Sequence, residues 1–229
     1  MPSLPLCRHV DSAVLKPELP RAAARAEIET GVKLRVRTVC VRPADIPMAL
    51  ELCRGSSTEV GTVLSFPHGC GLPAAKTAEA RAYLALGVPE IDMVANYGLI
   101  RSGEWALVEA DLRAVAELVV PAGALLKVIL ETSELSRDQI LRATEIAVAV
   151  GAQFVKTSTG FASGGATREA VAAMLEAGRG RIQVKASGAI RDAATAHAFL
   201  AMGCTRLGVG STAVPALLAG SPDAGQEPY

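Results

Sequence analysis

Eight short runs rich in β-branched residues alternate with alanine-rich segments along this chain, and that alternation is the strongest constraint on its fold. The runs cover residues 8–11, 34–41, 60–66, 90–95, 125–130, 154–159, 182–187 and 206–210. Eight strands, mostly followed by helices, in a chain of this length are typical of a single (β/α)8 TIM barrel, an α/β fold. A doubly wound open sheet is the alternative, because the sequence does not reveal the order of strands in a sheet.

Apolar spacing and capping residues predict five of the helices. Ser136 followed by Gln139 is a capping-box pattern, which marks the start of one of them. Glycines at 87, 151, 178 and 203 are expected to end four of them. The predicted helices cover residues 43–53, 73–86, 136–151, 168–177 and 192–202.

Composition limits the class of protein. Half of the 229 residues are hydrophobic, which is enough for one large core. Lys plus Arg (23) equals Asp plus Glu (23), so we expect no nucleic-acid partner. We predict one barrel domain over residues 1–220 and a flexible polar tail over residues 221–229.

Cysteine usage and hydropathy indicate the compartment. The five cysteines are odd in number and lack the CxxC or Cys/His spacing of a metal site. Residues 1–5 lack the charged and apolar regions of a signal peptide, and no run of 18 apolar residues is present. We therefore expect a reduced, cytoplasmic protein with no metal site and no membrane contact.

Two predicted strands each carry a lysine in the middle of a buried run. Lys156 lies in the segment QFVKTSTG, and Lys185 lies in IQVKASG. A buried ammonium is costly unless it is paired or neutral. A lysine held in the neutral form is a nucleophile toward carbonyl carbon, so the pair suggests Schiff-base chemistry.

Alternation along the strands gathers four polar side chains on the lumen side of the barrel. Asp92, Lys127, Lys156 and Lys185 each lie on the polar face of a predicted strand. Neighbouring parallel strands lie about 4.8 Å apart, so the two lysines come close if the sixth and seventh strands pair. Asp92 then lies two strands from Lys156, across the narrow lumen.

The predicted cluster can activate one amine. A free lysine has a pKa of about 10.4, and lowering it by roughly 3 units requires about 4 kcal/mol. A neighbouring ammonium and partial desolvation both favour the neutral amine, and we expect the ammonium to supply much of the effect. Asp92 can accept or relay a proton. The alternative is a structural Lys–Asp–Lys network that only neutralises itself.

Glycine-rich turns follow the last three predicted strands, at residues 159–165, 187–191 and 208–212. Glycine lets backbone N–H groups approach an anion closely, and a following helix start adds positive potential. Phosphate sites in barrels often use the loops after the seventh and eighth strands. Beside the lysine cluster, these turns indicate a phosphorylated substrate.

The segment FVKTSTG at residues 154–160 resembles the Schiff-base strand of deoxyribose-phosphate aldolases. Four further segments match the same family in the same order, and the similarity runs from about Val10 to Thr212. They are SFPHG (65–69), EIDMV (90–94), LKVILET (126–132) and VKASG (184–188). The resemblance implies a TIM barrel that, without a cofactor, reversibly cleaves 2-deoxy-D-ribose 5-phosphate to D-glyceraldehyde 3-phosphate and acetaldehyde.

The resemblance also implies roles for individual residues. Lys156 would form the imine, Lys185 would lower its pKa and Asp92 would transfer protons through water. Lys127 would lie near the substrate hydroxyls. Phosphate contacts would come from Gly160, Gly188, Arg191, Gly208 and Ser211. Further predicted substrate contacts are Asp11, Cys40 and Ser187, although Asp11 can instead tie down the first strand and Cys40 can be an inert core residue.

Several positions depart from the family pattern. Ala13 stands where threonine is usual, which removes a possible hydrogen bond to substrate. Ala189 replaces a common glycine and Gly210 a common serine, which implies weaker phosphate binding or an altered acceptor. Ser65 also replaces a common glycine. Some members end in a tyrosine that reaches the active site, and this chain ends in Tyr229.

Three other functions stay open from the sequence. One is a related Schiff-base aldolase for a different sugar phosphate, and another is a sugar-phosphate isomerase that uses Asp92 as its base. The third is a catalytically silent phosphosugar-binding barrel. The resemblance further implies a homodimer that acts in deoxyribose phosphate breakdown.

Overall fold

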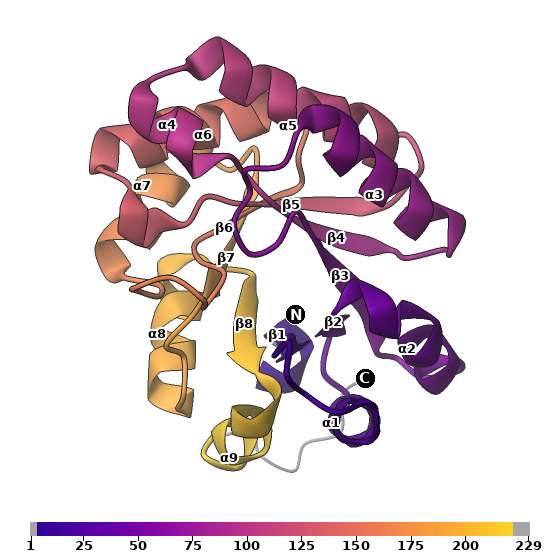
Figure 1. The fold of residues 1–229 in the computed structure, drawn as a ribbon. Helices are drawn as coiled ribbons and strands as arrows, with labels where there is room; N and C mark the ends of the chain where they lie inside the picture. Colours follow the sequence, from indigo (N-terminus) through magenta and orange to yellow (C-terminus); the bar gives the residue numbers. More distant parts are fainter. Residues whose placement is uncertain (1–3, 222–229) are drawn as a thin grey trace.

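Eight parallel strands close into a barrel in sequence order in the computed structural model, which describes residues 4–221 (Figure 1). The strands are β1 (Val10–Val14), β2 (Thr38–Val41), β3 (Glu59–Leu64), β4 (Glu90–Val94), β5 (Leu125–Ile129), β6 (Phe154–Lys156), β7 (Gln183–Ser187) and β8 (Arg206–Gly210). β8 pairs with β1, with Asp11 opposite Gly208, so closure leaves neither strand as a free edge. The predicted TIM barrel is therefore confirmed, and the open doubly wound sheet is excluded.

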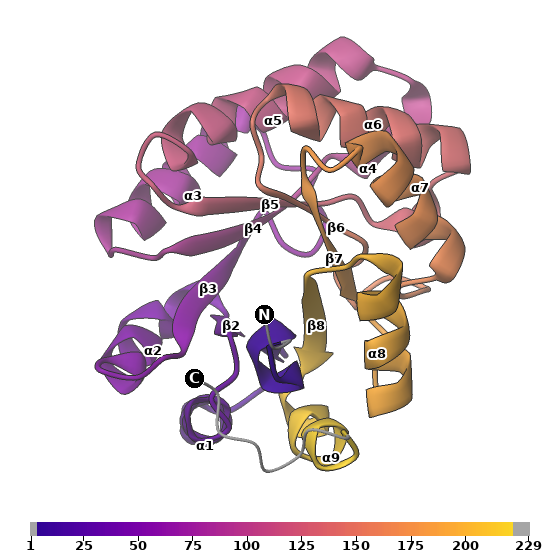
Figure 2. The same ribbon diagram turned by 180° about the vertical axis from the view of Figure 1, so that it is seen from behind.

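Helices connect successive strands and cover the outside of the barrel, as the two opposite views show (Figures 1 and 2). They are α1 (Arg21–Lys33), α2 (Ile46–Cys53), α3 (Pro73–Ala85), α4 (Tyr97–Ser102), α5 (Trp105–Val119), α6 (Arg137–Ala149), α7 (Arg168–Gly178), α8 (Ala193–Met202) and α9 (Val214–Ala219). Short 3-10 turns are η1 (Leu6–His9), η2 (Pro43–Asp45), η3 (Thr132–Glu134) and η4 (Ser211–Ala213). The capping box at Ser136 is present at the start of α6, as predicted. α1, α4, α5 and α9 lie outside the predicted helices.

The hydrophobic core lies between the strands and the helices. Ile91 and Met93 on β4 have no exposed surface and belong to this core, while Asp92 between them points the other way. The period-2 alternation of a strand produces this separation, because successive side chains leave opposite faces. The apolar outer face buries against helices, and the lumen receives the polar residues.

Two strands begin later in the structure than the sequence predicts. Residues 8 and 9 belong to the turn η1, so β1 starts only at Val10. Helix α1 continues to Lys33, and Arg35 then adopts a left-handed φ of 53°, which delays β2 until Thr38. Neither difference is visible in β-propensity, because both come from how the preceding segment packs and turns.

Two predicted helices differ at their ends for steric reasons. Pro47 has no N–H to donate, so it fits only in the first turn, and the α-helix begins at Ile46 after the turn η2. At the end of α7, Gly178 is still helical, and it packs so closely that a Cβ there would lie 2.9 Å from Ile182 Cγ2. Arg179 takes the left-handed capping position that was predicted for the glycine.

The described part of the chain ends at Ser221, which was predicted to begin the tail. Ser221 is buried, and its Oγ lies 3.0 Å from His197 Nε2 on α8. Residues 222–229 of the predicted tail, including Tyr229, lie outside the described residues. Within residues 4–221, no helix combines the length and apolar character needed to cross a membrane.

Candidate active site

Seven charged side chains meet inside the barrel, and we call them the lumen network. Each is at most 5% exposed, and they come from six of the eight strands, β1 and β4 to β8. The members are Asp11, Glu90, Asp92, Lys127, Lys156, Lys185 and Arg206. Charges buried to this degree persist only when they are paired and hydrogen-bonded, which is what the contacts show.

Arg206 and Glu90 form one end of the lumen network. Arg206 Nη2 donates to Glu90 Oε1 at 2.9 Å, and Arg206 Nη1 donates to Asp11 Oδ1 at 2.5 Å. The guanidinium carbon also lies 5.4 Å from the centroid of the Phe154 ring. Thr38 Oγ1 donates to Glu90 Oε2 at 3.1 Å. This end is closed and saturated, so it supports the barrel rather than a ligand.

Asp92 joins three ammonium groups at the other end of the lumen network. Lys127 Nζ donates to Asp92 Oδ1 at 2.8 Å. Lys156 Nζ and Lys185 Nζ both donate to Asp92 Oδ2, at 2.9 Å and 2.8 Å. Lys185 Nζ also donates to Asp11 Oδ2. The two lysines that the sequence singled out therefore share one carboxylate oxygen on the same side of the barrel wall.

Lys156 differs from the other lumen cations in the direction of its pKa. Burial lowers the pKa of Lys156 most, Asp92 opposes this, and the Lys185 ammonium adds to the lowering. Burial also lowers the pKa values of Lys185 and Lys127, but their carboxylate partners outweigh it and raise both overall. Burial raises the pKa of Asp92, but Lys127, Lys156 and Lys185 outweigh it and hold that pKa well below its usual range. Burial is thus a larger cause of the Lys156 shift than the neighbouring cation that the sequence argument emphasised.

The charge count of the lumen network leads to the same residue. The network holds four cations and three carboxylates when every group is ionised. Loss of one proton balances it, and Lys156 is the cation whose pKa is lowered. Lys156 is also the most exposed of the three lysines, at 4% against 1% for the others. The geometry thus favours a neutral, reachable amine at Lys156.

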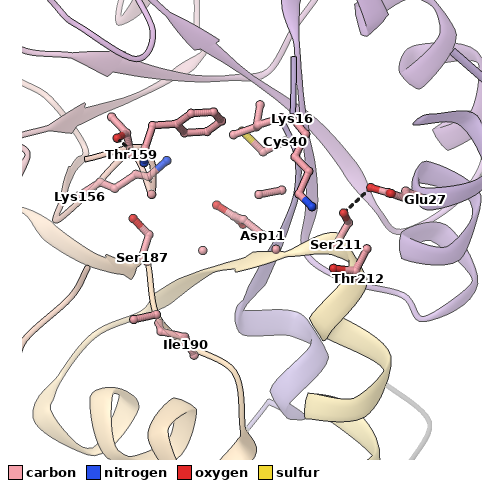
Figure 3. A pocket seen from close by; sticks show the side chains of 18 of the residues that line it. Asp11, Lys16, Glu27, Cys40, Lys156, Thr159, Ser187, Ile190, Ser211 and Thr212 are labelled. Atoms are coloured by element: carbon pink, nitrogen blue, oxygen red, sulfur yellow. Dashed lines mark hydrogen bonds between the residues drawn. The ribbon is translucent and has the colours of Figure 1, made fainter. Parts of the chain in front are cut away.

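A cavity of about 440 Å³ opens above the lumen network, at the C-terminal ends of the strands. This volume suits a small ligand, and barrel enzymes place their active sites at this face. Lys156 and Lys185 line it, and Figure 3 shows the Lys156 amine pointing inward. Among the residues described, no group of three or more His, Cys, Asp or Glu side chains gathers as a metal site would need.

Most of the predicted substrate contacts line this cavity, although they come from different strands. They are Asp11, Cys40, Gly160, Ser187, Gly188, Gly208 and Ser211. Gly208 is needed for packing, because a Cβ there would lie 2.6 Å from Ser187 Cβ and 3.3 Å from Lys185 Cε. Burial raises the pKa of the Cys40 thiol to about 11, so Cys40 remains a neutral thiol.

Two predicted substrate contacts lie elsewhere. Lys127 does not line the cavity, because its ammonium is held by Asp92 and by Glu90 Oε2 at 2.6 Å. Arg191 is exposed and lies outside the cavity lining, so the structure does not support the phosphate contact predicted for it. In both cases the side chain was placed in the right segment, but the sequence could not show which way it reaches.

Several residues of the site were not predicted. Arg206 shares the inward face of β8 with Gly208 and Gly210, so strand alternation could have identified it. Lys16 and Glu27 line the cavity from the loop after β1 and from α1. No local signal distinguishes them from surface charges, because the loop after β1 brings Lys16 to the cavity and the packing of α1 against β1 and η4 brings Glu27.

Replacement of Ala189 by glycine is expected to stabilise the protein. Ala189 lines the cavity with a left-handed φ of 62°, a conformation in which a Cβ is strained. Glycine removes this strain, but it loses more conformational entropy on folding than alanine does. The free energy of unfolding is therefore expected to rise by about 0.5 kcal/mol. Urea unfolding of both proteins measures it.

A matched control separates strain from glycine flexibility. Ala26 is exposed on helix α1, where glycine should lower the free energy of unfolding by about 1 kcal/mol. Opposite signs at Ala189 and Ala26 would support the strain argument. A loss of stability of the same size at both positions would contradict it.

Among known proteins, aldolases are similar to this chain, as a reactive lysine in a barrel cavity would lead one to expect. The family model described as DeoC/LacD family aldolase matches residues 20–205. A deoxyribose-phosphate aldolase of Geobacillus sp. (strain WCH70) is 39% identical over 206 residues, which are 90% of this chain and 92% of that protein. A solved structure described as an aldolase is similar with a TM-score of 0.85 and 34% identity, covering 90% of this chain and 91% of its own.

A further solved structure extends the likeness to a more distant relative. The deoxyribose phosphate aldolase of Aeropyrum pernix, described as a unique tetramer, has a TM-score of 0.83 at 26% identity. It covers 93% of this chain and 90% of its own. The family match over most of the sequence, together with these relatives, shows that the chain belongs to the DeoC/LacD family of aldolases.

Proposed function

We propose that this protein is a class I aldolase that reversibly cleaves 2-deoxy-D-ribose 5-phosphate, with Lys156 as the Schiff-base lysine. One observation carries the assignment of Lys156. It is the cation of the lumen network that both lines the cavity and has a lowered pKa. The deoxyribose-phosphate aldolases among its relatives support the choice of substrate.

The proposed reaction needs no group beyond the chain and water. The neutral Lys156 amine adds to the C1 aldehyde, and water leaves to give a protonated imine. The C3 hydroxyl then loses its proton, the C2–C3 bond breaks, and its electron pair moves to the imine to form an enamine. D-Glyceraldehyde 3-phosphate departs, the enamine is protonated at C2, and water releases acetaldehyde from Lys156.

Lys185 and Asp92 are proposed to manage the protons. Lys185 lines the cavity and stays charged, so it can donate a proton and favour the neutral form of Lys156. Asp92 contacts both amines and can pass protons between them. As a base acting alone Asp92 is weak, because its three ammonium partners hold its pKa well below the usual range. This counts against an isomerase that relies on Asp92.

Borohydride trapping tests the proposal directly. Reduction in the presence of acetaldehyde should leave a stable adduct, and peptide mass mapping should place it on Lys156. The variant Lys156→Met, which keeps the shape without the amine, should show no adduct. An adduct on Lys185 alone would show that Lys185, and not Lys156, is the nucleophile. The absence of an adduct on the wild-type chain would favour a catalytically silent binding protein.

The choice of substrate needs its own assay. Enzymatic detection of glyceraldehyde 3-phosphate should report its release from 2-deoxyribose 5-phosphate. A chain that traps acetaldehyde on Lys156 but releases no glyceraldehyde 3-phosphate would be an aldolase for another sugar phosphate. Trapping and product release therefore separate the chemistry from the substrate.

Likeness to the family is the basis on which we assign an assembly and a location. We propose a homodimer in the cytoplasm, where deoxyribose phosphate from nucleoside breakdown would be available. The tetramer described for the Aeropyrum pernix relative is a property of that protein. Light scattering coupled to size-exclusion chromatography would give the mass of the assembly, and a monomer would contradict the dimer.

A further inference from the structure

Glu27 reaches from helix α1 to the rim of the cavity above the lumen network. It lines the cavity and accepts a hydrogen bond from Ser211 Oγ, in the turn η4 that directly follows β8 (Figure 3). Glu27 is half-buried and Ser211 is 9% exposed, so solvent only partly screens this contact. A carboxylate is therefore built into the part of the rim where barrels commonly hold a phosphate.

The rim around Glu27 faces the far end of a bound substrate. Figure 3 shows Lys156 on one side of the cavity and Ser211 with Glu27 on the other. A sugar attached to Lys156 through C1 must extend its C5 substituent away from that lysine. The loops after β7 and β8 are the walls in that direction, and they include Gly188 and Ser211.

The charges on this rim do not suit a dianion. Lys16 is the one cation at the rim, against the two carboxylates of Glu18 and Glu27, and no arginine belongs to the cavity lining within residues 4–221. Gly210 has no side chain to donate a hydrogen bond, and the Ser211 hydroxyl is already donated to Glu27. The Thr212 hydroxyl, backbone N–H groups and Lys16 remain for a phosphate, and they must act beside the negative charge of Glu27.

We propose that Glu27 determines substrate specificity by weakening phosphate binding, so that the enzyme also cleaves unphosphorylated 2-deoxy sugars. A free C5 hydroxyl can donate a hydrogen bond to the Glu27 carboxylate, whereas a phosphate ester brings only negative oxygens. The bonds that form and break involve C1 to C3, so the neutral sugar reacts by the same steps and yields glyceraldehyde and acetaldehyde. This inference rests on the proposed aldolase activity.

Substitution of Glu27 by glutamine isolates the charge. The amide keeps an oxygen that can accept from Ser211, while it removes the negative charge from the rim. We expect kcat/KM for 2-deoxyribose 5-phosphate, divided by kcat/KM for 2-deoxyribose, to rise about tenfold, because removal of one partly screened like charge has effects of this order. Glu27→Ala, which removes the side chain, should change the ratio in the same direction.

Glu29 supplies the matched control. It lies on the same helix, is exposed and pairs with Arg25, but it does not line the cavity. Glu29→Gln makes the same change of net charge and should leave the ratio within about twofold of the wild type, since exposed surface charges are well screened. An equal rise in Glu29→Gln would overturn the inference, because it would show a general effect of net charge.

Inorganic phosphate gives a second readout at the same rim. It should inhibit cleavage of 2-deoxyribose more strongly in Glu27→Gln than in the wild type, by a similar factor. An unchanged substrate ratio and an unchanged inhibition constant in an active Glu27→Gln enzyme would refute the role of Glu27 and leave the aldolase proposal intact. A wild-type protein that cleaves neither sugar would instead remove the proposed function, and the inference with it.

Discussion

Replacement of Lys156 by alanine is expected to abolish cleavage, with kcat reduced by at least about 10⁴-fold. Lys156 is the lysine of the cavity lining whose pKa is lowered, so among the described residues it is the amine available as a neutral nucleophile. Lys185 keeps a raised pKa beside Asp11 and Asp92, so it remains an ammonium. Turnover of 2-deoxyribose 5-phosphate, followed through glyceraldehyde 3-phosphate, measures the loss.

The fold should survive this substitution. Asp92 keeps hydrogen bonds from Lys127 and Lys185 after the Lys156 ammonium is removed, so no buried carboxylate is left unpaired. Without Lys156 the lumen network holds three cations and three carboxylates, the same balance that it has with a neutral Lys156. We therefore expect the free energy of unfolding to stay within about 1 kcal/mol of the wild type.

A surface lysine provides the comparison. Lys33 is exposed at the end of helix α1, and Lys33→Ala should retain full activity and stability. If Lys156→Ala turned over substrate at more than a few per cent of the wild-type rate, the Schiff-base assignment would be wrong. If it unfolded at room temperature, Lys156 would be a structural member of the lumen network.

Replacement of Lys185 by leucine is expected to move the acid limb of the pH–rate profile to higher pH, by roughly one unit. The neutral Lys156 amine is the reactive form, so below its pKa the rate falls tenfold for each pH unit. The Lys185 ammonium lowers that pKa, and it also shares the Asp92 oxygen that stabilises charged Lys156. Removal of Lys185 therefore raises the pKa of Lys156 and leaves less neutral amine at neutral pH.

The Lys185→Leu substitution should reduce kcat/KM for two reasons, and the pH–rate profile separates them. The shifted limb should reduce kcat/KM at pH 7 about tenfold, and loss of the Lys185 proton donor should lower the plateau at high pH by a further tenfold or more. Asp11 keeps its contact with Arg206, so the barrel should stay folded. Lys185→Arg retains the cation, and its acid limb should lie close to that of the wild type. A limb that is unchanged in Lys185→Leu would refute the electrostatic role of Lys185.

The strand pattern was enough to predict which side chains enter the lumen. Side chains leave a strand on alternate faces whatever surrounds it, so the parity of Asp92, Lys156 and Lys185 could be read from sequence. The alternation does not show how far a side chain lies from the mouth of the barrel. Lys127 has the predicted face but lies bound between Glu90 and Asp92, outside the cavity lining, because distance from the mouth depends on strand register.

The cause of the Lys156 shift also required coordinates. A sequence reveals a neighbouring cation once the strands are paired, but it does not show how completely water is excluded from an amine. Burial is the largest cause of the lowered pKa of Lys156, and it arises from the closed barrel around that amine. The lowered pKa of Lys156 has the direction that the predicted activation requires, and burial is a cause that the sequence argument placed second.

The sequence alone determined the alternating strands and helices, the family resemblance and the strand face of each of the two lysines, because each of these is encoded in short local segments of the chain. Only the tertiary structure decided that Glu27 meets Ser211 and that Arg206 meets Glu90 and Asp11. Those partners are separated by 184, 116 and 195 residues, respectively. Their contacts exist because the barrel closes β8 onto β1 and packs α1 beside that seam, which no local pattern encodes.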